Sequence, residues 1–374
     1  MNEPIKVLYF VDRMLRGGIQ SLVIDWVSRF DKDKIHVDFL LLDDGKKYEL
    51  EDTLKKIGCN VYKLSGIWVK NPIDFIREAK ALDKFFKEHH DYKVVHMHSS
   101  SKNYMVLKYA KKYGIPVRIA HSHNIDFQTK NNIKKMYGKI LKRKLLKYST
   151  DYFACAEIAG EWLFGKKNVK NGKVKIIHNA VDYNKFEFNQ NIRDKIRKEF
   201  NINQNEKLYG NVGRFSNQKN HIFLIDIFYE IHQLDKNTKL ILVGEGEKKE
   251  EIKNKVKSLN LTKYVIFAGF RKDVNSIMQA MDVFLLPSLY EGLPVVGIEA
   301  QAAGLPVFTS KDVVTNELKI VENVEFISLE KSAKEWAEII MNRDLIRKNT
   351  KNQLNKAGYF IENSVNELTN YYLK

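Results

Sequence analysis

The sequence predicts an α/β protein with two doubly wound, Rossmann-like domains, each a mostly parallel sheet flanked by helices. Short apolar runs alternate with helical stretches, and this alternation restarts after residue 181. The length of 374 residues suits two domains of roughly 170 to 190 residues better than one ordinary domain. We expect an N-terminal domain over residues 1–180, a C-terminal domain over 181–345 and a helical segment over 346–374.

The expected strands are short apolar runs separated by turn residues or helical patterns. In the N-terminal domain they cover residues 7–11, 37–42, 94–97, 117–120, 152–155 and 174–177. Asn71 and Pro72 predict the start of a helix that extends to about residue 89, because proline is favoured in a first turn. In the C-terminal domain the expected strands cover residues 208–212, 240–243, 265–268, 283–286 and 307–309.

The composition is that of a soluble globular protein, with 44% hydrophobic and 29% charged residues. No apolar run approaches the ~20 residues that cross a bilayer, and the N-terminus lacks the pattern of a signal peptide. We therefore expect a cytoplasmic protein. The two cysteines, Cys59 and Cys155, exclude a disulfide framework and a cysteine-ligated metal site.

The net charge of +17 indicates an anionic partner, either nucleic acid, an anionic membrane surface or phosphorylated substrates. Residues 130–147 hold eight cations and no acid, interleaved with apolar residues at helical spacing. This pattern favours an interfacial helix on anionic lipid over an ordinary charged helix face. Nucleic-acid binding is disfavoured because no recognised nucleic-acid module accompanies the charge. The cations are Lys130, Lys134, Lys135, Lys139, Lys142, Arg143, Lys144 and Lys147.

Two glutamates follow the strand expected at residues 283–286. Glu291 lies in a Gly/Pro loop and Glu299 in the helix expected after it, at the position where open α/β sheets bind ligands. A helix start offers N–H groups to phosphate, and acidic side chains bind sugar hydroxyls. After the strand at residues 208–212, Arg214 and Lys219 supply two cations that would neutralise a leaving diphosphate. Together these residues predict a nucleotide-sugar site.

With these motifs the chain resembles the retaining glycosyltransferases of family 4, which have the GT-B fold. The resemblance rests on the Glu-x7-Glu motif, the Arg/Lys pair, the Asn-Ala-Val-Asp run from Asn179 and Gly17-Gly18, and it spans nearly the whole chain. Ala180 departs from the glycine that the family usually has there. The resemblance implies that the second domain binds the donor and the first the acceptor, with the active site in the cleft between them. It also implies that the last helix, residues 362–372, crosses back onto the first domain.

The resemblance also implies a role for each motif residue. Glu291 is expected to contact hydroxyls of the donor sugar, Glu299 the ribose hydroxyls, and Arg214 and Lys219 the diphosphate. The backbone nearby is expected to meet sugar and phosphate at Gly213, Gly292, Leu293, Pro294 and Val295.

Three further loops at strand ends are weaker candidates for the donor site. Gly17-Gly18 would let the backbone approach the diphosphate and acceptor, with a simple turn as the alternative. Gly244-Glu245-Gly246 lacks the third glycine of a dinucleotide fingerprint, so NAD binding is not indicated, but the resemblance places Gly244 and Gly246 near the donor pocket. Phe270 and Arg271 either cover the nucleobase or belong to a plain turn.

Four histidines lie at the ends of two expected strands, His96 and His98 on one and His121 and His123 on the other. The family carries a histidine near the reacting anomeric carbon, and both His121 and His123 fit that role. The four would also suit a metal site, but no acid of suitable spacing accompanies them, so we expect no metal.

From the resemblance we expect a metal-independent, retaining glycosyltransferase that moves a sugar from a UDP-linked donor to a glycan or lipid-linked acceptor. The nucleotide sugar is a substrate, and no cofactor is expected. The setting would be bacterial capsule or exopolysaccharide synthesis, at the inner face of the membrane. Two alternatives stay open: a UDP-sugar 2-epimerase of the same architecture, and a non-enzymatic polyanion-binding protein. The sequence does not reveal the sugar, the acceptor, the linkage or the oligomeric state.

Overall fold

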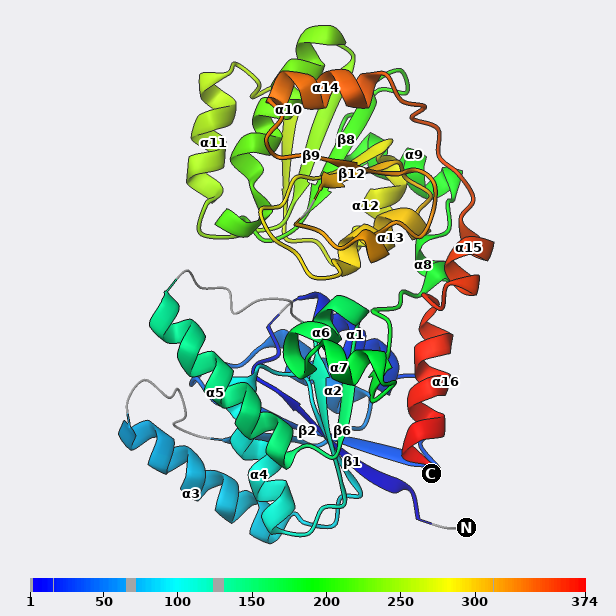
Figure 1. Cartoon of the computed structure of the whole chain (residues 1–374). Coiled ribbons are helices and arrows are strands. Elements are labelled where there is room, and N and C mark those ends of the chain that lie inside the picture. Colours follow the sequence, from blue (N-terminus) through cyan, green and yellow to red (C-terminus); the bar gives the residue numbers. More distant parts are fainter. Residues whose placement is uncertain (1–2, 16, 65–71, 124–130, 312) are drawn as a thin grey trace. The chain divides into compact units, whose positions relative to one another are not determined.

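The computed structural model describes residues 3–15, 17–64, 72–123, 131–311 and 313–374 (Figure 1). The chain divides into two compact units. Unit 1 consists of Met1–Asn179 together with Ile361–Lys374, and unit 2 consists of Ala180–Phe360. Each unit has its own parallel sheet, which confirms the predicted class of two doubly wound α/β bodies.

Among the described residues, the sheet of unit 1 has seven parallel strands in the order β3-β2-β1-β4-β5-β6-β7. The strands are β1 (Ile5–Val11), β2 (Ile35–Leu42), β3 (Val61–Leu64), β4 (Val94–Met97), β5 (Val117–Ser122), β6 (Asp151–Ala154) and β7 (Val174–Ile176). The helices are α1 (Gly18–Val27), α2 (Glu49–Lys56), α3 (Pro72–Glu88), α4 (Tyr104–Lys112), α5 (Asn132–Tyr148), α6 (Glu157–Phe164), α7 (Lys166–Lys170) and α16 (Ile361–Tyr372), with a 3₁₀ turn η1 (Ser101–Asn103).

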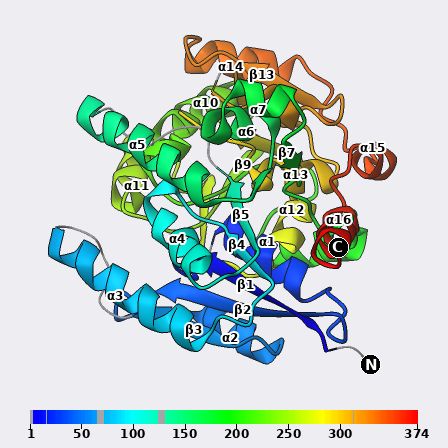
Figure 2. The ribbon, with the colours of Figure 1, turned by 60° about the horizontal axis from the view of Figure 1, so that its bottom comes forward.

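Two groups of helices cover the sheet of unit 1. On one face α3, α4 and α5 lie side by side (Figures 1 and 2). On the other face α1 packs against α16, which comes from the far end of the chain. Trp26 Nε1 of α1 donates a hydrogen bond to Ser364 Oγ of α16 at 2.7 Å, and both side chains are buried. Helix α16 therefore completes the core of unit 1.

Among the described residues, the sheet of unit 2 has six parallel strands in the order β10-β9-β8-β11-β12-β13. The strands are β8 (Lys207–Val212), β9 (Thr238–Val243), β10 (Val265–Gly269), β11 (Val283–Leu286), β12 (Val307–Ser310) and β13 (Val324–Ile327). The helices are α8 (Tyr183–Phe186), α9 (Gln190–Glu199), α10 (His221–Leu234), α11 (Lys249–Ser258), α12 (Val274–Ala280), α13 (Val295–Ala302), α14 (Ala333–Met341) and α15 (Lys351–Lys356), with 3₁₀ turns η2 (Asn217–Lys219) and η3 (Asn316–Leu318).

Helices α10, α11 and α14 cover one face of the unit 2 sheet, while α8, α9, α12 and α13 pack together in a second group. The first face encloses an apolar core in which Phe228 of α10, Trp336 of α14 and Leu285 of β11 are fully buried. Strands with both faces covered need continuous apolar runs, which is why the Val-Phe-Leu-Leu of β11 has no polar residue.

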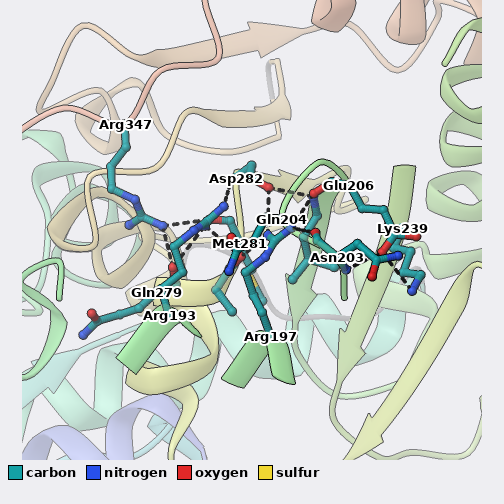
Figure 3. Close-up of polar contacts among 12 residues, drawn as sticks. Arg193, Arg197, Asn203, Gln204, Glu206, Lys239, Gln279, Met281, Asp282 and Arg347 are labelled. Carbon is teal, nitrogen blue, oxygen red and sulfur yellow. Dashed lines mark hydrogen bonds and ion pairs between the residues drawn. The ribbon is translucent and has the colours of Figure 1, made fainter. Parts of the chain in front are cut away.

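An arginine cluster lies at the amino edge of the unit 2 sheet, where α12 leads into β11. Arg193, Arg197 and Arg347 all donate hydrogen bonds to main-chain carbonyls in residues 278–281 (Figure 3). The carboxylate of Asp282 accepts from Arg193 at 2.7 Å and from Arg197 at 3.3 Å. Because a helix C-terminus leaves carbonyls unpaired and carries partial negative charge, three guanidinium groups here stabilise the end of α12.

The structure adds two edge strands to the predicted ones. Strand β3 is short and half-buried, with a lysine in it, and β13 has a glutamate between two apolar residues. Edge strands bury less surface and so lack the continuous apolar run that marks the central ones. The helix predicted from Asn71 is α3, whose described part begins at Pro72, and Asn71 itself lies outside the described residues.

Candidate functional site

The candidate donor site lies at the carboxyl edge of the unit 2 sheet. β8 and β11 are neighbours there, and the chain proceeds outward from them through β9 and β10 on one side and through β12 and β13 on the other. The loops after β8 and β11 therefore diverge, and open α/β sheets bind ligands at this point. Lys219 follows β8 and Glu291 follows β11, so two predicted site residues come from the two strands that flank it.

Lys219 and Glu291 form an ion pair in which Nζ donates to Oε1 at 2.6 Å. Their side chains are only 14% and 8% exposed. Taking two charges out of water costs several kcal/mol per ion, so such a pair is weak evidence for a stabilising role. The structure thus brings one predicted cation and one predicted acid together in a position with little exposure to water.

Two further side chains hold the carboxylate of Glu291. Ser288 Oγ donates to Oε1 at 2.9 Å, and Gln218 Nε2 donates to Oε2 at 3.3 Å. The loops themselves are joined, because Leu289 N donates to Gln218 O at 2.8 Å. Neither Ser288 nor Gln218 is among the predicted site residues, although each stands beside a predicted one in the chain. The described donors to the Glu291 carboxylate are all side chains. A sugar hydroxyl can displace a side-chain donor more easily than a main-chain one.

Three glycines pack the loops after β8 and β9 against each other. A Cβ atom on Gly244, which has φ +146°, would lie 2.0 Å from Gly213 O. A Cβ on Gly246 would lie 2.3 Å from Phe215 O, and one on Gly213 would press on the Lys219 side chain at 3.1 Å. Any side chain here would separate the loops, so the glycines have a packing reason. Their predicted contact with the donor stays a prediction.

Arg214 and Arg271 form ion pairs with carboxylates other than that of Glu291. The side chain of Arg214 is 73% exposed, and its Nη2 lies 3.1 Å from Glu247 Oε2. Arg271 pairs with Glu199 and Asp273, and its neighbour Phe270 is 45% exposed. Two carboxylates already hold the guanidinium of Arg271, which is the arrangement of a structural turn.

The loop after β11 leads through Gly292, Leu293 and Pro294 into α13, which begins at Val295. Among the described residues, no side chain caps the N-terminus of α13. Unpaired N–H groups at a helix start attract phosphate, so this end of α13 suits the predicted role of its backbone. Glu299 lies half-buried in the second turn of the helix.

In unit 1, the order of the sheet reverses between β1 and β4. Gly17 caps α1 with an extended backbone, and Gly18 is the first residue of the helix. Both are exposed, and a Cβ on Gly17 would approach only the flexible end of Gln20, at 2.7 Å. The two glycines thus follow β1 at the point where an α/β sheet accepts a ligand.

The four predicted histidines lie together in unit 1 and form two hydrogen-bonded pairs of rings. His96 Nε2 lies 3.0 Å from His121 Nδ1, and His98 Nδ1 lies 3.1 Å from His123 Nε2. The two rings on each strand also lie close together. The tilted rings of His96 and His98 have centroids 4.1 Å apart, and the stacked rings of His121 and His123 have centroids 4.2 Å apart. Two neighbouring strands with histidine at alternate positions produce this arrangement, because alternate residues share a face.

Burial keeps these histidines neutral. It lowers the pKa values of His96, His98 and His121 well below the usual range, and it lowers the pKa of His123 to about 4. Ring nitrogens of His96, His98 and His121 lie within 4.8 Å of one another. That spacing alone would suit a metal ion, but both nitrogens of His96 already have hydrogen-bond partners in the protein.

Asp12 is a half-buried acid that is not among the predicted site residues. Asn103 Nδ2 donates to Asp12 Oδ1 at 2.6 Å, and Ser99 Oγ donates to the same oxygen. Burial raises the pKa of Asp12, and burial with the nearby Asp12 charge raises the pKa of Glu78 to about 7. The one available signal was an acid directly after the strand predicted at residues 7–11.

Helix α5 covers most of the basic stretch of residues 130–147, and Lys130 lies outside the described residues. Its inner side buries Leu141 and Leu145. Its outer side exposes a stripe of large apolar residues, which is unusual for a surface that faces only water. The stripe consists of Ile133 (74% exposed), Met136 (62%), Tyr137 (54%) and Ile140 (45%). Among the described helices, none has the length and apolar content to span a bilayer.

Comparisons with known proteins show the family of the chain. Residues 16–185 match the family model described as Glycosyltransferase Family 4, and residues 192–360 match the one described as Glycosyl transferases group 1. The chain is 31% identical to the putative glycosyltransferase EpsF of Bacillus subtilis, over 100% of this chain and 97% of that protein. It is 28% identical to the capsular polysaccharide biosynthesis glycosyltransferase CapH of Staphylococcus aureus, over 99% of both.

A solved structure of Anabaena HepE in complex with UDP and glucose is also similar. It has a TM-score of 0.80 at 19% identity, covering 98% of this chain and 99% of that chain. The likeness shows the fold, in which two Rossmann-like units are joined in one chain. The sequence relationship places the protein among transferases of polysaccharide biosynthesis. The chain therefore belongs to the family 4 glycosyltransferases and has the GT-B fold.

Proposed function

We propose that this glycosyltransferase moves a hexose from a UDP-linked donor to a lipid-linked acceptor, with retention of configuration and without a metal ion. The product would be part of a capsule or exopolysaccharide. Support for UDP comes from the similar HepE structure, whose title names UDP and glucose. Support for the setting comes from the name of CapH.

The ion pair of Lys219 and Glu291 at the switch point of unit 2 carries the proposal. Lys219 presents an ammonium group with donors beyond the one that Glu291 receives, so it can bind an oxygen of the diphosphate. Glu291 keeps acceptor capacity for a sugar hydroxyl. The start of α13 adds backbone N–H groups. Fixed positive charge from Lys219 and α13 supports departure of the diphosphate without a metal ion.

In the proposed step, the hydroxyl oxygen of the acceptor bonds to the anomeric carbon while the bond from that carbon to the diphosphate breaks. UDP leaves from the face that the acceptor enters, so configuration is retained. The proton of the acceptor hydroxyl passes to an oxygen of the departing diphosphate. Lys219 and, as predicted from the family, Arg214 stabilise the negative charge that develops there.

The exposed stripe of α5 supports a lipid-linked acceptor. Its four apolar residues lie beside Lys139, Arg143, Lys144 and Lys147, which are exposed as well. Apolar side chains that enter a headgroup region, with lysines beside them, describe a helix that binds an anionic membrane surface. We therefore place the enzyme at the inner face of the cell membrane.

Thermal shifts with a panel of UDP, other nucleotides and nucleotide sugars test the donor site, because a ligand stabilises the fold that it binds. UDP and one UDP-sugar are expected to stabilise the parent, the sugar form more. In Glu291→Gln the shift with UDP should persist, while the extra shift from the sugar should disappear. Glu206→Gln, which alters a Lys–Glu pair of similar burial at the other edge of the sheet, serves as control.

A product assay separates this proposal from its rivals. Transfer by the parent and loss of about 10²–10³-fold in Glu291→Gln are expected. Release of a 2-epimer without any glycosylated acceptor would instead support the epimerase, and stabilisation by polyanions but by no nucleotide would support a binding protein.

Flotation with vesicles tests the membrane part. The parent should bind vesicles that contain phosphatidylglycerol and should not bind zwitterionic ones. Replacing the four exposed cations by Gln should weaken binding more than tenfold, since each contributes about 1 kcal/mol near an anionic surface. The matched control changes Lys253, Lys257, Lys334 and Lys348, which are exposed on unit 2. Equal binding by both variants would reject α5 as the contact.

A further inference from the structure

A chain of hydrogen bonds links the C-terminal helix of unit 1 to His121. Tyr9 of β1 and Tyr372 of α16 have their hydroxyl oxygens 2.8 Å apart. Tyr372 Oη lies 2.6 Å from His96 Nδ1, and His96 Nε2 lies 3.0 Å from His121 Nδ1. Four elements, β1, α16, β4 and β5, thus contribute one ring each to a single line of contacts.

All four rings are isolated from water. Tyr9 and His96 are 0% exposed, and Tyr372 and His121 are 1% exposed. Burial raises the pKa values of both tyrosines and lowers those of both histidines, so the four groups are neutral near pH 7. Each ring therefore carries one mobile hydrogen, and its position on a histidine is decided by the neighbouring ring.

The hydrogens can be arranged along the chain in two directions. In the first, Tyr9 donates to Tyr372, and Tyr372 donates to His96 Nδ1. His96 then carries its hydrogen on Nε2 and donates it to Nδ1 of His121, so His121 carries its own hydrogen on Nε2. In the reverse direction, the hydroxyl hydrogen of Tyr9 has no acceptor among the described residues, and Nε2 of His121 is a bare acceptor.

Free energy favours the first direction. Nε2 of His121 is buried and has no partner among the described residues in either case. The reverse direction adds a second unsatisfied group, the buried hydroxyl hydrogen of Tyr9. A buried polar group without a partner costs free energy, so the arrangement with one such group is preferred over that with two.

We propose that Tyr372 and His96 are positioning residues that hold His121 as its Nε2–H tautomer, with a hydrogen-bond donor ready for a ligand. The ligand group would be an oxygen atom of a bound saccharide, and this last step rests on the proposed transferase function. An N–H group without a protein partner, at the end of β5 where an α/β sheet accepts ligands, is kept at a cost that ligand binding removes.

A metal ion would compete with these hydrogen bonds for the ring nitrogens of His96. His96 could coordinate a metal only by giving up its hydrogen bond to Tyr372 or to His121, and its ring is tilted by 34° against that of His98, with centroids 4.1 Å apart. The hydrogen-bonded chain accounts for both ring nitrogens of His96. It is therefore the assignment that we test, and metal binding is one of the outcomes that would overturn it.

Nuclear magnetic resonance of the full-length protein labelled with ¹⁵N at histidine reads the tautomers directly. Near pH 7, His96 and His121 should each show a bare Nδ1 and a protonated Nε2. The signals are assigned by comparison with His121→Asn and His96→Asn. In Tyr372→Phe, which keeps the ring and removes the oxygen, His121 should shift toward the Nδ1–H form. Tyr371→Phe removes a hydroxyl from the same helix outside the chain and should leave both tautomers unchanged.

Kinetics test the positioning role. Tyr372→Phe should lower kcat about tenfold with KM for the donor unchanged, since one oriented hydrogen bond is lost and donor binding in unit 2 is untouched. Tyr9→Phe removes the alternative acceptor of the Tyr372 hydroxyl, so Tyr372 still donates to His96, and both the tautomers and kcat should stay close to those of the parent. If Tyr372→Phe does not fold, His96→Phe, which removes the donor to Nδ1 of His121, still reports whether the tautomer depends on the chain.

Three results would overturn the inference. They are an Nδ1–H form of His121 in the parent, an unchanged tautomer of His121 in both Tyr372→Phe and His96→Phe, and one tightly held equivalent of Zn²⁺ in the parent that His96→Asn loses. An altered tautomer with an unchanged kcat would reject the positioning role. Absence of transfer by the parent with every donor would reject the proposed function instead, and it would leave the tautomer measurement intact.

Discussion

The two edges of the unit 2 sheet hold clusters of charged residues that differ in what the cations contact. At the amino edge Arg197 donates to the main-chain oxygens of Ala280, Asn203 and Glu206, and Lys239 donates to that of Asn201. At the carboxyl edge the described partner of Lys219 is the carboxylate of Glu291.

This difference distinguishes cations that stabilise the fold from a cation that can bind a ligand. A cation that binds main-chain carbonyls closes helix ends and turns, and no ligand can replace it without unfolding them. A cation that binds only another side chain can exchange that partner for a phosphate oxygen. Similar burial thus has opposite meanings: the Lys239–Glu206 pair is 14% and 17% exposed, and the Lys219–Glu291 pair is 14% and 8% exposed.

The largest expected effect is on stability, at the amino edge. Arg197→Met should destabilise unit 2 by about 3–5 kcal/mol, because it leaves Asp282 and three carbonyls with fewer donors in a buried position. Urea unfolding measures the change. Arg343→Met, which removes an exposed pair with Glu325, should cost less than about 1 kcal/mol. Equal losses in the two variants would contradict the structural role of the cluster.

The second effect is on transfer, at the carboxyl edge. Lys219→Met should lower kcat about 10²–10³-fold while the protein stays folded, because fixed charge near the departing diphosphate is lost. Lys239→Met should keep the transfer rate of the parent and lose stability instead. Steady-state kinetics and thermal melts of both variants check this. Loss of transfer in both would mean that the two edges do not divide the roles.

The third effect extends the comparison to unit 1, whose buried histidines respond to acid. Their pKa values are lowered in the folded state, so folding favours the neutral form. The contribution of these histidines to the free energy of unfolding is fully present above the unfolded pKa of about 6.5. It is lost as pH falls toward about 4, where His123 titrates. His123 alone accounts for about 3 kcal/mol over this range.

Limited proteolysis between pH 7 and pH 4 measures this loss for each unit. Unit 2 has one histidine whose pKa is lowered to about 4, His221. Among the described residues of unit 1, three buried histidines and the half-buried His123 have lowered pKa values, so unit 1 should become cleavable at higher pH than unit 2. The variant His123→Gln should flatten the dependence of unit 1 on pH, and a parent whose unit 2 is cut first would refute the expectation.

The smallest effect concerns Arg214, which shares a loop with Lys219 but is 73% exposed and pairs with Glu247. In water its charge is screened, so Arg214→Gln should raise KM for the donor about three- to tenfold and leave stability unchanged. A loss as large as that in Lys219→Met would show that Arg214 turns inward when the donor binds.

Much of this architecture could be predicted from the sequence. The central strands are continuous apolar runs, and parallel strands end at one edge, so the sequence predicts a common site for Lys219 and Glu291 although 72 residues separate them. The partners of polar groups could not be predicted, because no local pattern encodes contacts between distant residues. Arg214 meets Glu247 across 33 residues, and Tyr372 meets His96 across 276.

The exposed apolar surface of α5 defines a second limit. The spacing predicts an amphipathic helix, but only the structure shows that Ile133 and Met136 lie outside the core, since apolar spacing alone is the same for an inward and an outward face. The structure also gives His121 and His123 different partners: Trp26 stacks on His121 with ring centroids 6.0 Å apart, and His96 lies within hydrogen-bond distance of His121.

The connection of α16 to unit 1 constrains how the protein is made. A ribosome releases residues 1–179 first, but the helix that covers Tyr9 and His96 emerges only after all of unit 2 has been synthesised. During that interval an apolar, histidine-rich surface stays uncovered on the nascent chain. Chaperones that shield such surfaces should therefore bind unit 1 throughout translation of unit 2 and leave when Tyr372 docks.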